Sequence, residues 1–201
     1  VSDTETKTNF ITVIDPSGSA FDFEETVNYP INGTIANYGT QGGGYVAGNN
    51  EYGDLAKANY IANPGSYISV KGATIGFMNV VGSSAIPVTV WADNGGSPGA
   101  ALGSVNVSAA TAASDIASQS YTNVQFASNI DITGSNFFIG VELPTSAGDT
   151  VVVYSNTDGD TNPGIAWELW SDGDWYDMNT AWQGLNIGLT IHPIVASAYY
   201  S

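Results

Sequence analysis

The 201-residue sequence predicts an all-β fold, a jelly-roll β-sandwich that covers residues 20–196. Short stretches rich in β-branched and aromatic residues recur along the chain, and clusters of Gly, Asn, Asp, Ser and Pro separate them. Apolar and polar residues alternate in VTVWAD and over Leu185–Ile194, which indicates strands with one buried face. Helical periodicity is poor. Many short strands with frequent turns favour a sandwich over an α/β fold.

The predicted strands follow one another at short intervals. In chain order they are Phe10–Ile14, Tyr67–Val70, Thr74–Val81, Pro87–Trp91, Leu102–Val107, Tyr121–Phe126, Phe137–Leu143, Thr150–Tyr154, Ile165–Trp170 and Leu185–Ile194. One segment, AATAASDIAS at residues 109–118, could form a short helix. It lacks the wide apolar stripe of a packed helix, and this argues against a helix there.

The two ends of the chain differ from the predicted sandwich. Residues 1–14 are polar and Thr-rich before one apolar stretch, and TKTNFITVI resembles the closing strand of a PKD domain. These residues are therefore either the last strand of an upstream PKD-like domain or the first strand of the sandwich itself. We expect residues 15–19 to be a turn-forming linker and residues 197–201 to be a tail. The chain begins with Val and shows no signal peptide, so we expect it to be a segment of a longer protein.

Basic residues are scarce. Lys7, Lys57 and Lys71 are the only Lys or Arg residues beside 19 acidic ones, which gives a formal net charge of -16. Such a chain cannot neutralise the phosphates of a nucleic acid, and anionic membranes repel it. No apolar run reaches the ~18 residues of a spanning helix, so we expect no membrane insertion. Cysteine is absent, which excludes disulfides and thiolate sites. Neutral glycans, proteins and divalent cations remain as partners.

Several motifs beyond residue 20 resemble a known group of domains when they are taken in order. They are FDFEE with NYP, VWADNGGSPGAALGS, NFFIGVEL, IAWELWSDGDWYDM and AWQGLNIGLTIHPIV. This order resembles the cleaved-adhesin and MAM-like jelly-roll accessory domains of secreted Bacteroidetes proteins, over roughly residues 20–195. The resemblance implies an extracellular module attached to a protease or glycosidase, without a single ligand. It also implies that a carboxylate at the position of Glu24 helps to bind a structural calcium ion.

A loop near the C-terminal end has a composition typical of calcium sites. YSNTDGDTNPG places oxygen-bearing side chains at every second position, namely Asn156, Asp158, Asp160 and Asn162. Calcium takes six to eight oxygen ligands from such groups at about 2.3–2.6 Å. The loop is not an EF-hand, because Trp167 stands where the twelfth-position Glu is needed. The alternative is a solvated turn built from ordinary turn residues.

A second acidic group is predicted at the start of the domain. In FDFEE the alternation places Asp22 and Glu24 on one face of a strand, and NNEYGD offers Asn50 and Asp54 as partners from another loop. A chain with so few basic residues has few ion pairs to neutralise these carboxylates, so a cation is expected to do so. The alternative is solvated surface charge.

Aromatic residues gather near residue 170. Flat rings beside hydrogen-bonding groups suit the stacking of neutral sugars. The predicted glycan-binding residues are Trp170, Asp172, Asp174, Trp175 and Tyr176. Alternation places Trp167 in the core and Trp170 on the polar face with Glu168, and Asp172-Gly173 predicts a hairpin turn. The alternative is that these rings pack in the core.

Catalytic motifs are absent. The sequence has no G-x-S-x-G or H-E-x-x-H, and His192 lies in an apolar strand. The sequence therefore predicts a non-catalytic, calcium-stabilised module that binds glycan or protein outside the cell or on its surface. One alternative is a structural spacer beside a secreted hydrolase. A lower alternative is a glycoside-active enzyme that uses Glu168 with Asp172 or Glu142.

Overall fold

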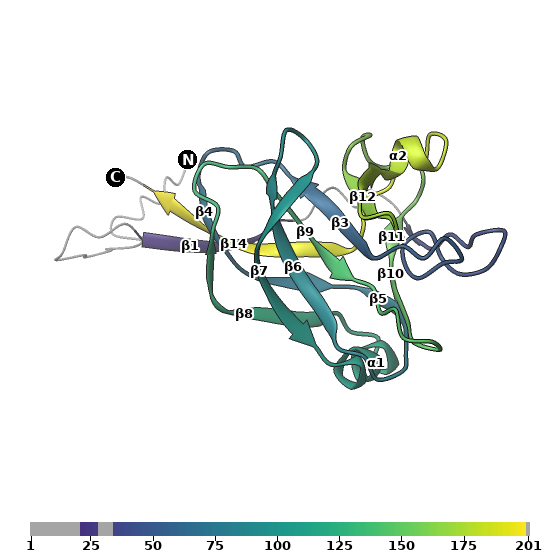
Figure 1. Cartoon of the computed structure of the whole chain (residues 1–201). Helices are drawn as coiled ribbons and strands as arrows, with labels where there is room; N and C mark the ends of the chain where they lie inside the picture. Colours follow the sequence, from purple (N-terminus) through teal and green to yellow (C-terminus); the bar gives the residue numbers. More distant parts are fainter. Residues whose placement is uncertain (1–20, 28–33, 200–201) are drawn as a thin grey trace, which may run out of the picture.

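The computed structural model describes residues 21–27 and 34–199, which contain two large antiparallel sheets and two short strand pairs (Figure 1). The first sheet has the order β1 (Phe21–Thr26), β14 (Ile191–Tyr199), β4 (Tyr67–Ile75), β8 (Thr122–Asp131). The second has the order β13 (Trp175–Asp177), β12 (Ala166–Leu169), β3 (Ala56–Ile61), β9 (Phe137–Glu142), β6 (Ile86–Asp93), β7 (Pro98–Val107). Smaller elements are the strand pairs β10 (Thr150–Val153) with β5 (Phe77–Val81) and β11 (Ser155–Asn156) with β2 (Ile35–Ala36), and the helices α1 (Ala109–Ala117) and α2 (Met178–Ala181).

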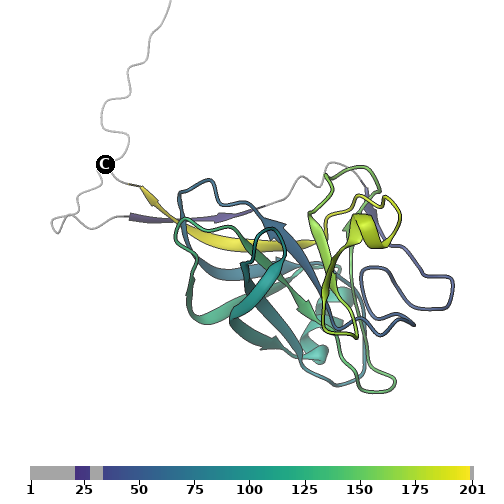
Figure 2. The same ribbon diagram turned by 45° about the horizontal axis from the view of Figure 1, so that its top comes forward.

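The strand pairing is nested, which confirms the predicted jelly-roll sandwich. β1 pairs with β14, β3 with β9, β4 with β8, and β6 with β7, so early strands pair with late ones and middle strands pair with each other. This pattern arises when one long antiparallel hairpin is wrapped into two sheets. Both ribbon views show β1 beside β14 at one end of the molecule (Figures 1 and 2).

The main core lies between the sheets, and a smaller cluster covers the outer face of the second sheet. Val88, Val90, Ile139 and Val141 of the second sheet pack in the main core with residues of the first, such as Val70. The outer cluster is built from Ala56, Ala58, Trp91 and Phe138, with Tyr60, Trp167, Leu169 and Trp175 packed against them. The second sheet therefore buries apolar side chains on both faces.

Helix α1 does form, so the argument against a helix at residues 109–118 was wrong. Its N-cap is Ser108, whose hydroxyl oxygen accepts a hydrogen bond from the Thr111 backbone N–H at 3.0 Å. The helix buries only Ala109 and Ala112. A side-chain cap and two small buried residues therefore hold this helix in place, although it has no wide apolar stripe.

Strand boundaries differ from the prediction at several places, and the largest differences concern β3 and β14. Strand β3 was missed, because its polar residues face the core. The predicted strand Leu185–Ile194 begins only at Ile191, although Ile187 and Leu189 are buried in the connection before it. β14 then runs through Ser197 to Tyr199, where a tail was expected. The predicted strand and linker in residues 1–19 lie outside the described residues. In the described part of the chain, no helix is long and apolar enough to cross a membrane.

Candidate ligand-binding site

A buried ion-pair cluster lies where β3 meets β12. Lys57 and Glu168 are directly opposite each other in the register of these strands, and their charged ends are 2.7 Å apart. The Lys57 ammonium also lies 2.5 Å from an oxygen of Asp54. All three side chains are at most 1% exposed. Burial removes three charges from water, so the cluster depends on its mutual pairing and on further hydrogen bonds.

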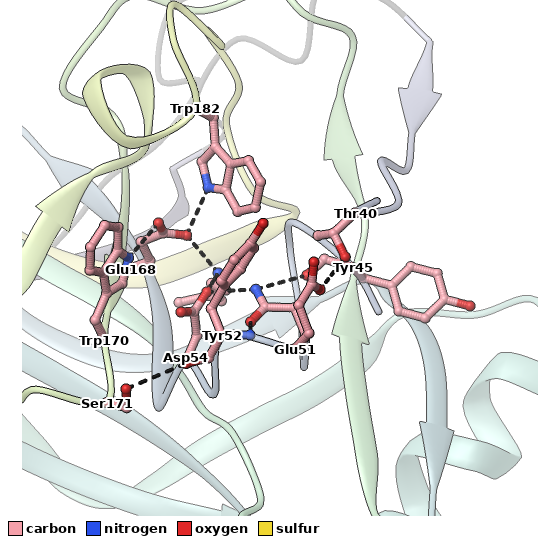
Figure 3. Close-up of polar contacts among 11 residues, drawn as sticks. Thr40, Tyr45, Glu51, Tyr52, Asp54, Glu168, Trp170, Ser171 and Trp182 are labelled. Atoms are coloured by element: carbon pink, nitrogen blue, oxygen red, sulfur yellow. Dashed lines mark hydrogen bonds and ion pairs between the residues drawn. The ribbon is translucent and has the colours of Figure 1, made fainter. Parts of the chain in front are cut away.

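Two tryptophans complete the hydrogen bonding of Glu168 (Figure 3). The Trp170 indole N–H donates to Oε1 at 2.6 Å, and the Trp182 indole N–H donates to Oε2 at 3.0 Å. Since Oε2 also accepts from Lys57, both oxygens of Glu168 are occupied. The buried carboxylate thus holds both indole rings in position.

The side-chain oxygens of Asp54 have fewer hydrogen-bond partners than those of Glu168. Its Oδ2 accepts from Lys57 and from the Asn50 side-chain amide at 2.7 Å. Its Oδ1 is buried and has no hydrogen-bond partner among the described residues. Buried polar atoms in folded proteins nearly always have a partner, whether protein, water or ligand. This oxygen is therefore the natural acceptor for a bound group.

These residues line a pocket of about 570 Å³. Its lining residues are Tyr52, Asp54, Glu168, Trp170, Ser171, Asp172, Ala181, Trp182 and Gln183. Tyr52 is 58% exposed and meets Trp182 edge to face, with ring centroids 5.9 Å apart. The negative charge of Glu51 raises the pKa of Tyr52, so its phenol stays neutral. The pocket combines aromatic faces with buried oxygen acceptors, which is the composition of many ligand sites.

The structure divides the predicted glycan-binding residues between two depressions. Trp170 and Asp172 line the pocket, whereas Asp174, Trp175 and Tyr176 line a shallower depression of about 620 Å³ beside the turn between β6 and β7. The rings of Trp170 and Tyr176 stack at a centroid distance of 3.9 Å, and this stacked pair lies between the pocket and the shallower depression. Tyr176 donates its hydroxyl hydrogen to Asp172 at 3.0 Å, and this bond raises the pKa of Tyr176.

The alternation of β12 was correctly predicted, but its faces were reversed. Glu168 points into the molecule and is fully buried, while Trp167 belongs to the outer cluster and meets Phe138 at a centroid distance of 5.8 Å. The predicted Asp172-Gly173 turn is present: Gly173 has φ of 91°, and the Trp170 N–H donates to the Asp174 carbonyl at 3.0 Å.

Sequence reasoning missed several residues of the pocket. It had not assigned Lys57, Tyr52 or Trp182 to a binding site, and it considered Glu168 only as a possible glycosidase carboxylate. Lys57 sits in AKANYI, where polar residues alternate with alanines, and this alternation could have indicated a strand. Nothing in the alternation shows that its polar face is the buried one. The pairing of Lys57 with Glu168 spans 111 positions and carries no local signal.

The calcium loop residues make hydrogen bonds within their own turn and to the connection before β14. The Asn156 side chain is buried, donates to Thr161 at 3.0 Å and accepts the Gly188 N–H at 2.7 Å. Asp158 accepts the Asn186 N–H at 2.8 Å. Asp160 has a buried Oδ2 that lacks a partner among the described residues, and Asn162 is exposed.

The second predicted calcium group is not assembled in the structure. Asp22 and Glu24 lie in β1 of the first sheet, where Glu24 pairs with Lys71 at 2.7 Å. Asn50 and Asp54 lie in the loop before β3, at the opposite end of the molecule in Figure 1. Within residues 21–27 and 34–199, no group of three or more acidic or His side chains could hold a metal ion. Calcium binding therefore stays a prediction.

Of the residues considered for catalysis, Glu168 and Asp172 line the same pocket, whereas His192 and Glu142 lie away from it. His192 is half-buried in β14 of the first sheet, and desolvation lowers its pKa, so the imidazole is neutral near pH 7. Glu142 accepts the Thr89 hydroxyl at 2.8 Å in β9. It shares the outer face of its strand with Phe138, whereas Glu168 points inward. Glu142 and Glu168 therefore do not face one cleft, as a pair of glycosidase carboxylates must.

The chain is similar to known proteins in its fold but not in its sequence. No protein-family profile and no curated protein sequence matches the chain. Among solved structures, a similar one contains the cysteine protease and lectin-like domains of Cwp84, a surface layer associated protein of Clostridium difficile, with 18% identity and a TM-score of 0.49. Another is clostridial Cwp84 after propeptide cleavage, with 16% identity and a TM-score of 0.52. The matches cover 72% and 81% of this chain but only 32% and 40% of those chains.

Proposed function

We propose that this chain is a non-catalytic accessory domain of a secreted or cell-surface protein, and that it binds a glycan in the pocket formed by Tyr52, Trp170 and Trp182. The observation that carries this proposal is the unpartnered buried Oδ1 of Asp54 in the wall of an aromatic pocket. Sugar rings present apolar C–H faces that stack on aromatic rings, and their hydroxyls donate to such oxygens.

The arrangement of the pocket supports binding rather than catalysis. Both oxygens of Glu168 are occupied, so this carboxylate is not available as a proton donor or nucleophile. Its indole partners are held in fixed orientations, which lowers the entropy lost when a ligand stacks on them. The fold is similar to part of the clostridial cysteine protease Cwp84, with the match covering 40% of that chain, and this is compatible with an accessory domain attached to a protease.

Replacing Trp170 by alanine is expected to weaken glycan binding at least about tenfold, because stacking area is lost and Glu168 loses a donor. Trp167→Ala is the matched control, since Trp167 lies in β12, just before Trp170 in the sequence, but packs on the outer face. It should lower the melting temperature without changing affinity. Isothermal titration against a panel of neutral and amino oligosaccharides, with thermal unfolding of each variant, measures both quantities. Equal affinities for wild type and Trp170→Ala would contradict the proposal.

The predicted calcium ion is a second proposal, and the buried unpartnered oxygen of Asp160 favours the loop at residues 156–162 as its site. Millimolar calcium is expected to raise the melting temperature relative to EDTA, because a ligand that binds only the folded state stabilises it by mass action. The double variant Asp158→Asn/Asp160→Asn should lose that rise. An unchanged melting temperature in calcium would instead leave this loop as a solvated turn.

A further inference from the structure

The hydrogen-bonding groups inside the pocket are almost all acceptors. The two indole N–H groups donate to Glu168. The Lys57 ammonium is buried and pairs with Asp54 and Glu168, so it does not face a ligand. The Ser171 hydroxyl donates to the Tyr52 carbonyl at 3.4 Å. What remains for a ligand is Oδ1 of Asp54, with the Tyr52 phenol and Gln183 amide at the rim. The exposed carboxylate of Asp172 already accepts from Tyr176 and from the Asp174 N–H, but its negative charge faces the pocket.

The pocket also carries excess negative charge. Asp54, Glu168 and Asp172 line it, and Lys57 is the one cation that pairs with them among the described residues. Three carboxylates beside one ammonium leave two uncompensated negative charges. The aromatic faces of Tyr52, Trp170 and Trp182 add the negative side of their ring quadrupoles. Both effects favour a ligand that is positively charged and donates hydrogen bonds.

We infer that the pocket selects an amino sugar with a free, protonated amine over the same sugar with a hydroxyl or an acetylated amine. This inference rests on the proposed glycan-binding function and specifies its ligand class. The ammonium would donate to Oδ1 of Asp54, which has no donor among the described residues, while the ring faces stack on the indoles. Acetylation removes the charge and adds bulk, and a hydroxyl supplies a weaker, uncharged donor.

Three tetrasaccharides with the same β-1,4-linked backbone provide the test, because they differ only at one substituent of each ring: amine, N-acetyl or hydroxyl. Dissociation constants are measured by calorimetry, below the pKa of the amine. We expect the amino form to bind at least about tenfold more tightly than the other two, the range of a partly desolvated cation–π contact plus a charged hydrogen bond. Its affinity should fall as salt is raised, whereas that of the hydroxyl form should not.

Variants separate recognition in the pocket from general attraction to an acidic protein. Asp172→Asn removes a pocket charge and should reduce the preference for the amine, and Trp170→Ala should abolish it. Glu25→Gln removes one charge from exposed β1, in the other sheet, and should leave the preference unchanged. An effect of Glu25→Gln as large as that of Asp172→Asn would overturn the inference, because attraction would then be non-specific.

The outcomes distinguish the two proposals. If all three tetrasaccharides bind with equal affinity and Trp170→Ala weakens all of them, the glycan-binding proposal stands and the inference fails. If the N-acetyl form binds most tightly, the inference also fails. If none of the three binds and a wider glycan panel is negative, both proposals fail, and the spacer alternative is favoured.

Discussion

Replacing Glu168 by alanine is expected to lower the free energy of unfolding by about 3–5 kcal/mol, the usual cost of removing one partner from a buried ion pair. The change leaves the buried Lys57 ammonium beside a single carboxylate. It also leaves two indole N–H groups without their acceptor. For a domain of this size the melting temperature should fall by about 6–20 °C.

Glu142→Ala is the matched control, because Glu142 is also a strand carboxylate but is partly exposed and has no ion-pair partner among the described residues. It should cost about 1 kcal/mol or less, the contribution of one hydrogen bond. Equilibrium unfolding in urea measures both variants. A loss for Glu168→Ala no larger than for Glu142→Ala would mean that water solvates Lys57 and that the cluster does not order the pocket.

The sheets were largely predictable because alternation follows directly from strand geometry. Side chains on a strand point to opposite faces in turn, so VTVWAD and IAWELW were correctly assigned as strands. Alternation does not reveal which face is buried. In β12 the face with the carboxylate is inside, and in β3 Lys57 and Asn59 point to the same interior. Composition alone favours the opposite assignment, since Lys and Glu are almost never fully buried unless paired.

The pocket was only partly predictable, because it depends on pairing between distant segments. Trp170 and Asp172 were identified from the local cluster of aromatic and acidic residues. Tyr52 and Lys57 join them only when β3 pairs with β12, a register that no local pattern encodes. The contacts of Asn59 could not be predicted for the same reason. Its side-chain amide makes hydrogen bonds with the backbone of Leu189, which is far along the chain, and so helps to hold the connection before β14.

Replacing Gly140 by alanine is expected to cost about 3 kcal/mol, at the upper end of the range for overpacking. Gly140 lies in β9 between β3 and β6, and a Cβ atom there would be 2.0 Å from the Lys57 carbonyl oxygen and 2.7 Å from the Ala58 Cα. The obstacle is backbone, so no change of rotamer relieves it. β3 would have to move, and it would carry Lys57 out of line with Glu168.

Gly140→Ala should therefore weaken glycan binding as well as stability, although Gly140 does not line the pocket. Gly188→Ala is the matched control, because its Cβ would meet Thr161 at an ordinary contact distance of 3.5 Å. It should change stability by about 0.5 kcal/mol or less and leave affinity unchanged. If Gly140→Ala lost stability but kept full affinity, then β3 could shift without disturbing Lys57. That result would mean that the pairing register of β3 and β12 does not position the residues of the pocket.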